Sequence, residues 1–306
     1  MDENLTRLSG VIDIGTNSTR LLIASLEQGR LHIIRKASQI TRLGRGVDSE
    51  RQLSSTAMQE TLDVVLAYLA EARTAGAAQV SIIATSAVRD AANRHVFAEL
   101  LCQATGHQLQ ILSGVEEAML SYRGALSGFA VPPTAPMVAD VGGGSTELVM
   151  GDKLAVSLDI GAVRLTERFL RSNPVTVAEA SDARSYVHRQ LKTLGDQLLR
   201  PQCLVGLGGT ITCLGGVVAA IPVYDSAVVH MSRIDQARLE SIIENLAALD
   251  IAQRREIIGM QPGREDIILG GALIFQCLLQ AFNLGEIIVC DADIMEGVLL
   301  SEMEIH

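Results

Sequence analysis

Three short apolar segments follow one another near the start of the chain, at residues 11–14, 20–26 and 31–36. They are rich in Val, Ile and Leu and are bounded by glycine or polar residues, which is typical of β-strands. The period then changes, because apolar side chains recur every three or four positions over residues 53–75, and Gly76 follows. This spacing predicts an amphipathic helix that ends at the glycine.

The rest of the first half continues to alternate between strands and helices. Apolar runs predict strands at 80–85 and 109–112, and helical spacing predicts helices at 92–104 and 116–126. The predicted order is therefore βββαβαβ, with a further helix after the last strand. A proline-rich segment at 128–136 follows this helix and is predicted to be a loop.

The same order begins again at residue 137. The hydrophobic pattern predicts strands at 137–141, 146–150, 154–159, 203–207 and 286–290, and helices at 163–170, 177–199, 236–249, 252–259 and 266–281, with an apolar helix after Thr210 and another after Asp293. Alternation of this kind predicts an α/β protein with a duplicated βββαβα core. We expect two domains, residues 1–116 joined by a C-terminal helix at 294–306, and residues 117–293.

Composition supports two folded domains and excludes several partners. The chain has 306 residues and 48% hydrophobic residues, so each half can bury a core. Its net charge of −10 argues against nucleic acid as the partner, because duplex binding needs a broad basic face. Tryptophan is absent and aromatic residues make up only 3%, which also argues against base-stacking platforms.

The cysteines and the N-terminus indicate a reducing compartment. The five cysteines include no Cys-x-x-Cys pair and lie in or beside apolar segments, so we expect small buried thiols. The acidic N-terminus lacks the apolar segment of a secretory signal, and no apolar run is long enough to span a bilayer. A cytoplasmic protein without a membrane partner is the resulting expectation.

A duplicated motif is the most informative feature of the chain. Residues 13–22 (DIGTNSTRLL) are echoed by residues 140–149 (DVGGGSTELV), offset by 140 − 13 = 127 positions. Each copy ends one strand, turns through Gly and Ser or Thr, and begins a second strand. Such hairpin tips present backbone N–H groups to phosphate oxygens. The candidate phosphate-binding residues are Gly15, Thr16, Asn17 and Ser18 in the first copy, and Gly142, Gly143, Gly144, Ser145 and Thr146 in the second.

Together with this motif, four further segments carry a resemblance to a known family. They are LGRGV at 43–47, ATSAVRDA at 84–91, SGVEEA at 113–118 and GGT at 208–210. In this order the chain resembles the exopolyphosphatase and guanosine pentaphosphate phosphohydrolase (Ppx/GppA) family. The resemblance implies two ribonuclease H-like domains, of the actin, sugar-kinase and chaperone ATPase superfamily, around an interdomain cleft. The chain is similar to short members, since it stops before the all-helical C-terminal domain of longer ones.

Glu117 is the candidate general base. Hydrolysis of a phosphoanhydride needs a carboxylate that orients or deprotonates the attacking water. Glu116 precedes it at the start of the same predicted helix, about 100° around the axis, so only one of the two can face a cleft. The alternative is that both are solvated acids favoured by the helix dipole. The resemblance selects the glutamate directly before Ala118, and whether Glu116 shares the role stays open.

Asp13, Asp140 and Glu147 are the candidate metal ligands. Mg²⁺ prefers one or two carboxylates together with water and substrate phosphate, and the resemblance implies Mg²⁺ or Mn²⁺ here. The alternative is a capping aspartate and an exposed strand glutamate. The first copy carries Arg20 where the second carries Glu147. This difference suggests that one hairpin holds the cation while the other neutralises phosphate directly.

Arginines and a second glycine turn complete the set of candidates. Arg20 and Arg89 follow strand ends in Ser- and Thr-rich turns, where a guanidinium can bind phosphate in pairs of hydrogen bonds. Arg264 is a further candidate. The turn of Gly208, Gly209 and Thr210 precedes an apolar helix whose N-terminus can hold phosphate, although it can also be a tight turn only.

These observations predict a phosphoanhydride hydrolase that releases terminal orthophosphate from inorganic polyphosphate. Conversion of guanosine pentaphosphate to guanosine tetraphosphate is a second reaction that the resemblance implies. Two alternatives stay open: an ATP-dependent kinase or ATPase of the same superfamily, and a guanosine tetra- or pentaphosphate sensor with little turnover. A homodimer is the default expectation for the assembly, because twofold symmetry is the commonest.

Overall fold

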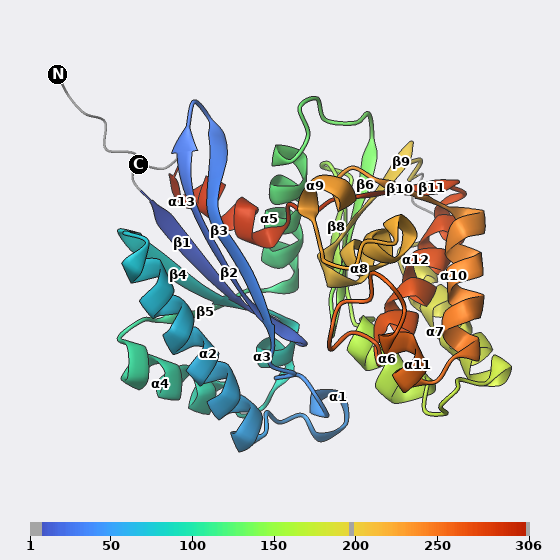
Figure 1. Cartoon of the computed structure of the whole chain (residues 1–306), viewed down its shortest axis with the longest axis horizontal. Helices are drawn as coiled ribbons and strands as arrows, with labels where there is room; N and C mark the ends of the chain where they lie inside the picture. The colour runs from blue at the N-terminus through green and yellow to red at the C-terminus, as the bar shows by residue number, and fades with distance from the viewer. Residues whose placement is uncertain (1–7, 196–198, 304–306) are drawn as a thin grey trace. The chain divides into compact units, whose positions relative to one another are not determined.

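The computed structural model describes residues 8–195 and 199–303, which form two compact α/β units (Figure 1). The first unit lies within Met1–Ser127 and Ile294–His306, and the second is Gly128–Asp293. Each unit contains one mixed sheet with helices packed against it. The predicted α/β class with a duplicated βββαβα core is therefore confirmed.

The first unit begins with three antiparallel strands and continues with helices between parallel strands. Its elements are β1 (Ser9–Ile14), β2 (Ser18–Glu27), β3 (Arg30–Ile40), α1 (Val47–Glu50), α2 (Ser55–Thr74), β4 (Gln79–Ala84), α3 (Ser86–Asp90), α4 (Arg94–Thr105), β5 (Leu109–Ile111), α5 (Gly114–Ser127) and α13 (Ile294–Met303). The strand order is β3-β2-β1-β4-β5, in which β1 pairs antiparallel with β2 and parallel with β4.

The second unit repeats this plan and adds an edge strand. Its elements are β6 (Pro136–Val141), β7 (Thr146–Met150), β8 (Leu154–Leu158), α6 (Ala162–Phe169), α7 (Val177–Lys192), β9 (Cys203–Leu207), α8 (Gly208–Ala219), α9 (Ser226–Val229), β10 (Arg233–Asp235), α10 (Gln236–Ala248), α11 (Ile251–Arg255), α12 (Ile268–Phe282) and β11 (Glu286–Val289). The order is β10-β11-β9-β6-β7-β8, so β6 takes the place that β1 has in the first sheet.

The two faces of the first sheet are buried by different helices. Ile12 and Ile14 belong to a cluster with residues of α2 and α4, whereas Val11 belongs to a cluster with Met295 and Leu299 of α13. Side chains alternate between the faces of a strand, so Asp13 shares the face of Val11. Arg20, which stands opposite Asp13 in the register, lies on the same face. The first hairpin therefore directs its polar pair to the α5–α13 side of the sheet (Figure 1).

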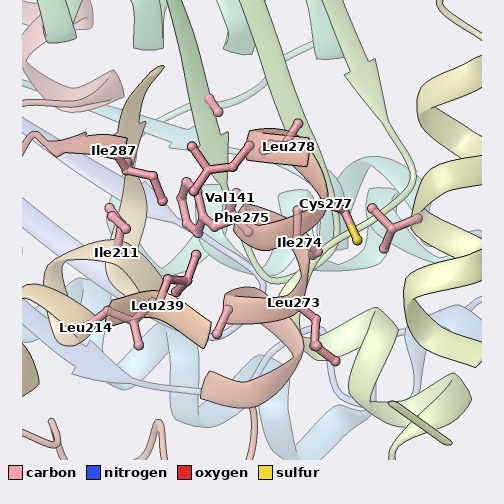
Figure 2. Packing of buried hydrophobic residues seen from close by; sticks show 14 of the residues in the cluster. Val141, Ile211, Leu214, Leu239, Leu273, Ile274, Phe275, Cys277, Leu278 and Ile287 are labelled. Atoms are coloured by element: carbon pink, nitrogen blue, oxygen red, sulfur yellow. The ribbon is translucent and has the colours of Figure 1, made fainter. Parts of the chain in front are cut away.

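The core of the second unit surrounds α12. This helix is apolar on all sides and is buried along nearly its whole length, because α6, α7, α8 and α10 pack around it. Figure 2 shows Phe275 and Ile274 of α12 beside Val141 of β6. Ala139, Val141 and Leu148 face this core, so the alternating residues Asp140 and Glu147 lie on the opposite face of the sheet.

The structure corrects several sequence-based boundaries. The two units divide between Ser127 and Gly128, not between residues 116 and 117, because α5 is one continuous helix that packs along α13. The predicted helix at 177–199 ends at Lys192, and residues 196–198 lie outside those described. The short elements α3 and β10 were not predicted, since three to five residues carry too little periodicity.

The cysteines and the helix lengths can also be compared with what the sequence predicts. All five cysteines are free; three are buried, whereas Cys102 and Cys203 are half-buried. Burial raises the pKa of the Cys213 thiol. Within residues 8–195 and 199–303, every helix is too short or too polar to cross a bilayer.

The close contact of α13 with α5 gives a stability prediction. A Cβ added at Gly297 would overlap the carbonyl oxygen of Leu120, which belongs to helix backbone and cannot move aside. We expect Gly297→Ala to lower the free energy of unfolding by about 1–3 kcal/mol, the usual cost of overpacking a core. Denaturant unfolding of both proteins measures this difference.

Gly285→Ala is the matched control, because a Cβ there meets nothing within 4 Å. It should change the free energy of unfolding by less than about 0.5 kcal/mol, as surface substitutions usually do. Equal stability of Gly297→Ala and wild type would contradict the packing described for α5 and α13.

Candidate active site

Both copies of the duplicated motif form the same hairpin tip. In the first, the amide of Gly15 donates to the carbonyl of Ser18 at 3.0 Å, and in the second the amide of Gly142 donates to the carbonyl of Ser145 at 3.0 Å. The strands on either side pair antiparallel in both copies. The predicted glycine-containing hairpins are therefore present in both units.

The residues at the base of the two tips differ in charge. In the first hairpin Asp13 stands opposite Arg20, whose Nε and Nη2 donate to Asp13 Oδ2 at 2.9 and 2.6 Å. Asp13 is buried, with 2% of its surface exposed. The guanidinium thus compensates a buried carboxylate, as a charge in this position requires.

In the second hairpin the corresponding positions hold two acids. Asp140 stands opposite Glu147, and both are buried. Ser157 on the neighbouring strand donates to Glu147 Oε1 at 2.7 Å. Like charges directly opposite each other destabilise an antiparallel pair unless a cation or a proton compensates them. Two buried carboxylates are donors of the kind that a divalent cation prefers.

Loop 41–46 and α3 hold the first tip in place. The amides of Thr41 and Arg42 donate to the carbonyl of Asn17 at 3.1 and 2.9 Å, and the amide of Gly44 donates to the carbonyl of Thr16 at 2.8 Å. The hydroxyls of Thr16 and Ser86 are 2.9 Å apart. The conformation of the tip is thereby linked to α3, the helix that carries Arg89.

Arg89 and Glu117 form an ion pair in the first unit. Arg89 Nη1 donates to Glu117 Oε2 at 2.6 Å and to the carbonyl of Leu112 at 3.1 Å. Glu117 is 7% exposed although it lies in the first turn of α5. A glutamate that only caps a helix is solvated, so burial beside an arginine favours a role for Glu117 beyond helix capping.

Glu116 caps the helix instead. Its Oε2 accepts from the amide of Ser113 at 2.8 Å, while the hydroxyl of Ser113 accepts from the amide of Glu116 at 3.3 Å. This reciprocal arrangement is a capping box. The hydrogen bonds from Ser113 lower the pKa of Glu116, which is exposed to solvent. The two neighbouring glutamates thus have different surroundings.

The second tip is supported by the start of α6. The carbonyl of Gly142 accepts from the amide of Ala162 at 2.9 Å, and the carbonyl of Gly143 accepts from the amides of Val163 and Arg164 at 2.9 and 3.1 Å. The hydroxyl of Thr146 donates to the carbonyl of Ile160 at 2.6 Å. The start of helix α6 thus provides hydrogen-bond donors for the carbonyl groups of the tip.

Gly208, Gly209 and Thr210 form the first turn of α8, which has no side-chain cap. A Cβ at Gly208 would lie 2.9 Å from Asp140 Oδ1, and one at Gly209 would overlap the guanidinium of Arg264. Asp140 and Arg264 are thereby both placed beside the start of α8. Uncapped amides at a helix N-terminus together with a guanidinium favour an anion.

The candidates therefore fall into two groups. The first unit brings together the tip at 15–18 with Asp13 and Arg20, and also pairs Arg89 with Glu117. The second unit brings together Asp140, Glu147, the tip at 142–146, the turn at 208–210 and Arg264. That the groups share a cleft stays a prediction. Residues 8–195 and 199–303 contain no cluster of three or more His, Cys, Asp or Glu side chains that could hold a metal.

Several residues that hold these candidates in place could not be assigned that role from the sequence. Ser113, Thr41 and Gly44 act through hydrogen bonds to Glu116 and to the first tip. The capping sequence Ser-x-x-Glu at 113–116 was a visible signal for the first of these. For the loop residues no local pattern indicates a partner twenty or more positions away.

These features define a two-unit α/β protein with twin glycine-containing hairpins, buried acids and paired arginines. A family model described as the Ppx/GppA phosphatase family matches residues 22–306. Exopolyphosphatase 2 of Mycobacterium tuberculosis is 38% identical over 97% of this chain and 98% of its own length. Exopolyphosphatase 1 of Mycobacterium leprae is 26% identical over 96% of this chain and 89% of its own.

A solved structure gives the same result. The Aquifex aeolicus member of the Ppx/GppA family superimposes with a TM-score of 0.83, at 30% identity over 98% of both chains. The chain belongs to the Ppx/GppA phosphatase family, as its motifs predicted.

The capping box at Glu116 gives a pH prediction. Its pKa is lower in the folded protein than the ordinary value of 4.5, so the ionised carboxylate stabilises the fold above about pH 4.5 and this stabilisation is lost as the pH falls further. We expect Glu116→Gln to be less stable than wild type at neutral pH, and the difference to diminish as the pH falls below about 4.5.

Gln keeps an oxygen for the Ser113 amide but does not titrate, so the comparison isolates the charge. Unfolding in denaturant at several pH values measures it, at low salt. A stability difference that grows on acidification would contradict the assignment of Glu116 as a helix cap.

Proposed function

We propose that this protein is a divalent-cation-dependent phosphoanhydride hydrolase that releases orthophosphate from the end of inorganic polyphosphate. The observation that carries the proposal is the change from an Asp–Arg pair in one hairpin to an Asp–Glu pair in the other. The two similar hairpin tips would therefore have different roles, one next to a cation and the other next to an arginine. The names of the mycobacterial relatives support polyphosphate as the substrate.

Glu117 acts as the general base in this proposal. A buried carboxylate in an ion pair is held in one orientation, which suits it to accept a proton from an attacking water. Glu116 does not share this role, since its carboxylate is bonded to the Ser113 amide. Arg89 orients Glu117 and adds positive charge close to the reacting phosphoryl group.

Asp140 and Glu147 would hold Mg²⁺ or Mn²⁺. Two buried acids opposite each other are a suitable donor set, because Mg²⁺ combines one or two carboxylates with water and phosphate oxygens. When bound, the ion supplies compensation for charge on the phosphate oxygens. Asp13 fits a metal ion less well, since Arg20 already donates two hydrogen bonds to it.

The remaining candidates bind the phosphates. The amides of the tips at 15–18 and 142–146, other than those of Gly15 and Gly142 that close the hairpins, would donate to phosphate oxygens. Arg264 and the start of α8 would form a further anion-binding position. A loose phosphoryl-transfer transition state carries its charge on the equatorial oxygens, so fixed N–H donors and arginines stabilise it.

We propose guanosine pentaphosphate as a second substrate, because its 5′ end also offers a terminal phosphoanhydride. A cytoplasmic location is consistent with both substrates and with five free thiols. A homodimer without nucleic acid remains part of the proposal. A kinase or ATPase, and an alarmone sensor without turnover, are the outcomes that the assays below would reveal instead.

One assay tests the function. Orthophosphate release is measured from short polyphosphate, long polyphosphate, guanosine pentaphosphate and ATP, each with and without Mg²⁺. Release from polyphosphate without any nucleotide supports the proposal. Phosphate transfer from ATP to small alcohols would indicate a kinase, and tight guanosine tetraphosphate binding with negligible release from every substrate would indicate a sensor.

Glu117→Gln should lower kcat for polyphosphate about 10²- to 10⁴-fold, the usual contribution of a general base. Its adjacent control, Glu116→Gln, should keep kcat within about twofold, because the carboxylate at 116 serves the helix cap. Steady-state kinetics of both variants decides. Comparable losses in the two variants would rule out a specific role for Glu117.

Glu147→Gln should raise the Mg²⁺ concentration for half-maximal activity at least about tenfold, since one of two carboxylates is removed. Glu244→Gln, an exposed change on α10, is the control. A thermal-shift titration with Mg²⁺ gives a readout independent of turnover. An unchanged Mg²⁺ response in Glu147→Gln would argue against the metal position.

A further inference from the structure

The guanidinium of Arg264 occupies a defined place in the second unit. It lies against Gly209 in the first turn of α8, in space that a Cβ at that position would fill. Arginine side chains have several rotatable bonds, so a guanidinium is held in one place only when other groups fix it.

Gln261 is one such group, and it contacts Arg264 twice. Its side-chain Oε1 accepts from Arg264 Nε at 3.0 Å, and its carbonyl accepts from the Arg264 amide at 3.2 Å. The first bond fixes the rotation of the guanidinium plane. The side chain that accepts this bond is an uncharged amide, whereas carboxylates of Asp13 and Glu117 accept from Arg20 and Arg89.

Gln261 is itself anchored to α8. Its backbone amide donates to the Sγ of the buried Cys213 at 3.4 Å, and Cys213 lies one turn along the helix from Gly209. The same helix therefore provides both the surface under the guanidinium and the anchor for the residue that orients it. A displacement of loop 259–264 relative to α8 would move both contacts.

The other side of the loop is held by Glu265. Its Oε2 accepts from the amide of Gly263 at 2.7 Å, and its Oε1 accepts from Arg255 Nη2 at 2.8 Å. Burial opposes ionisation of Glu265, but these hydrogen bonds outweigh it and lower the pKa of the carboxyl. Arg264 thus projects from a short segment that is held at residues 261 and 265.

We propose that Gln261 is a positioning residue that holds Arg264 at the start of α8, in the orientation that binds the phosphate chain of the substrate. The inference rests on the proposed function, in which Arg264 is a phosphate-binding residue. A guanidinium binds two phosphate oxygens well only when its plane is fixed. Loss of Gln261 should therefore weaken substrate binding and leave the chemical step little changed.

The test compares Gln261→Leu, Arg264→Ala and the double variant. We expect Gln261→Leu to raise KM for polyphosphate about tenfold, within the range for a hydrogen bond to a charged group, with kcat within about twofold. In the Arg264→Ala background the same change should have no further effect on KM, since there is no guanidinium to orient. An additive effect in the double variant, or an unchanged KM in Gln261→Leu, would overturn the inference.

Two additional variants separate positioning from folding. Gly209→Ala displaces the guanidinium from the other side and should reproduce the KM increase of Gln261→Leu. Gln59→Leu removes one exposed glutamine hydrogen bond on α2 and should leave KM unchanged. If Gln261→Leu raises KM but also lowers the melting temperature and kcat, its role is structural only.

A binding measurement keeps this inference separate from the proposed function. Calorimetric titration with inorganic tripolyphosphate needs no turnover. If wild type binds tripolyphosphate but releases no phosphate, the hydrolase proposal fails, and weaker binding by Gln261→Leu still supports the positioning role. Equal binding by wild type and Gln261→Leu, or no binding by wild type, overturns it.

Discussion

The residue opposite the strand-end aspartate of each hairpin is the constraint around which both units are organised. A carboxylate buried at the end of a strand must be compensated. In the first unit Arg20 does so directly, at 2.6 Å. In the second unit Glu147 occupies the equivalent position, so two acids stand opposite each other there. The same backbone therefore carries an Asp–Arg pair in one copy and an Asp–Glu pair in the other.

Neighbouring segments hold the tips of both hairpins in place through hydrogen bonds. Backbone amides of the 41–46 loop hold the first tip, and the start of α6 holds the second. Arg89 donates to Glu117, whereas the amide of Ser113 donates to Glu116, so the adjacent glutamates at the start of α5 have different partners. In the second unit, α8 supplies the surface for Arg264 and the anchor for Gln261. The candidate side chains in both units are thus held by hydrogen bonds from neighbouring segments.

Much of the fold could be predicted because the hydrophobic period is a local property. The three opening strands and the long helix at 55–74 are encoded by side chains within a few residues of each other. The boundary at 127 could not be predicted in this way, since it depends on the packing of Gly297 against Leu120, far apart in the chain. The short helix α3 could not be predicted either, because five residues show no clear hydrophobic period.

The sequence by itself determined the duplicated hairpins, the α/β class, the family and the identity of the candidate residues, because spacing and residue type carry that information. Only the tertiary structure decided which of two adjacent glutamates is buried, which arginines pair with acids, and which neutral side chain contacts Arg264. These outcomes depend on hydrogen bonds between segments, such as the pair of Gln261 with Cys213, 48 positions away. Such a contact cannot be predicted from the local sequence, because each of the two residues also fits the pattern of its own helix or loop.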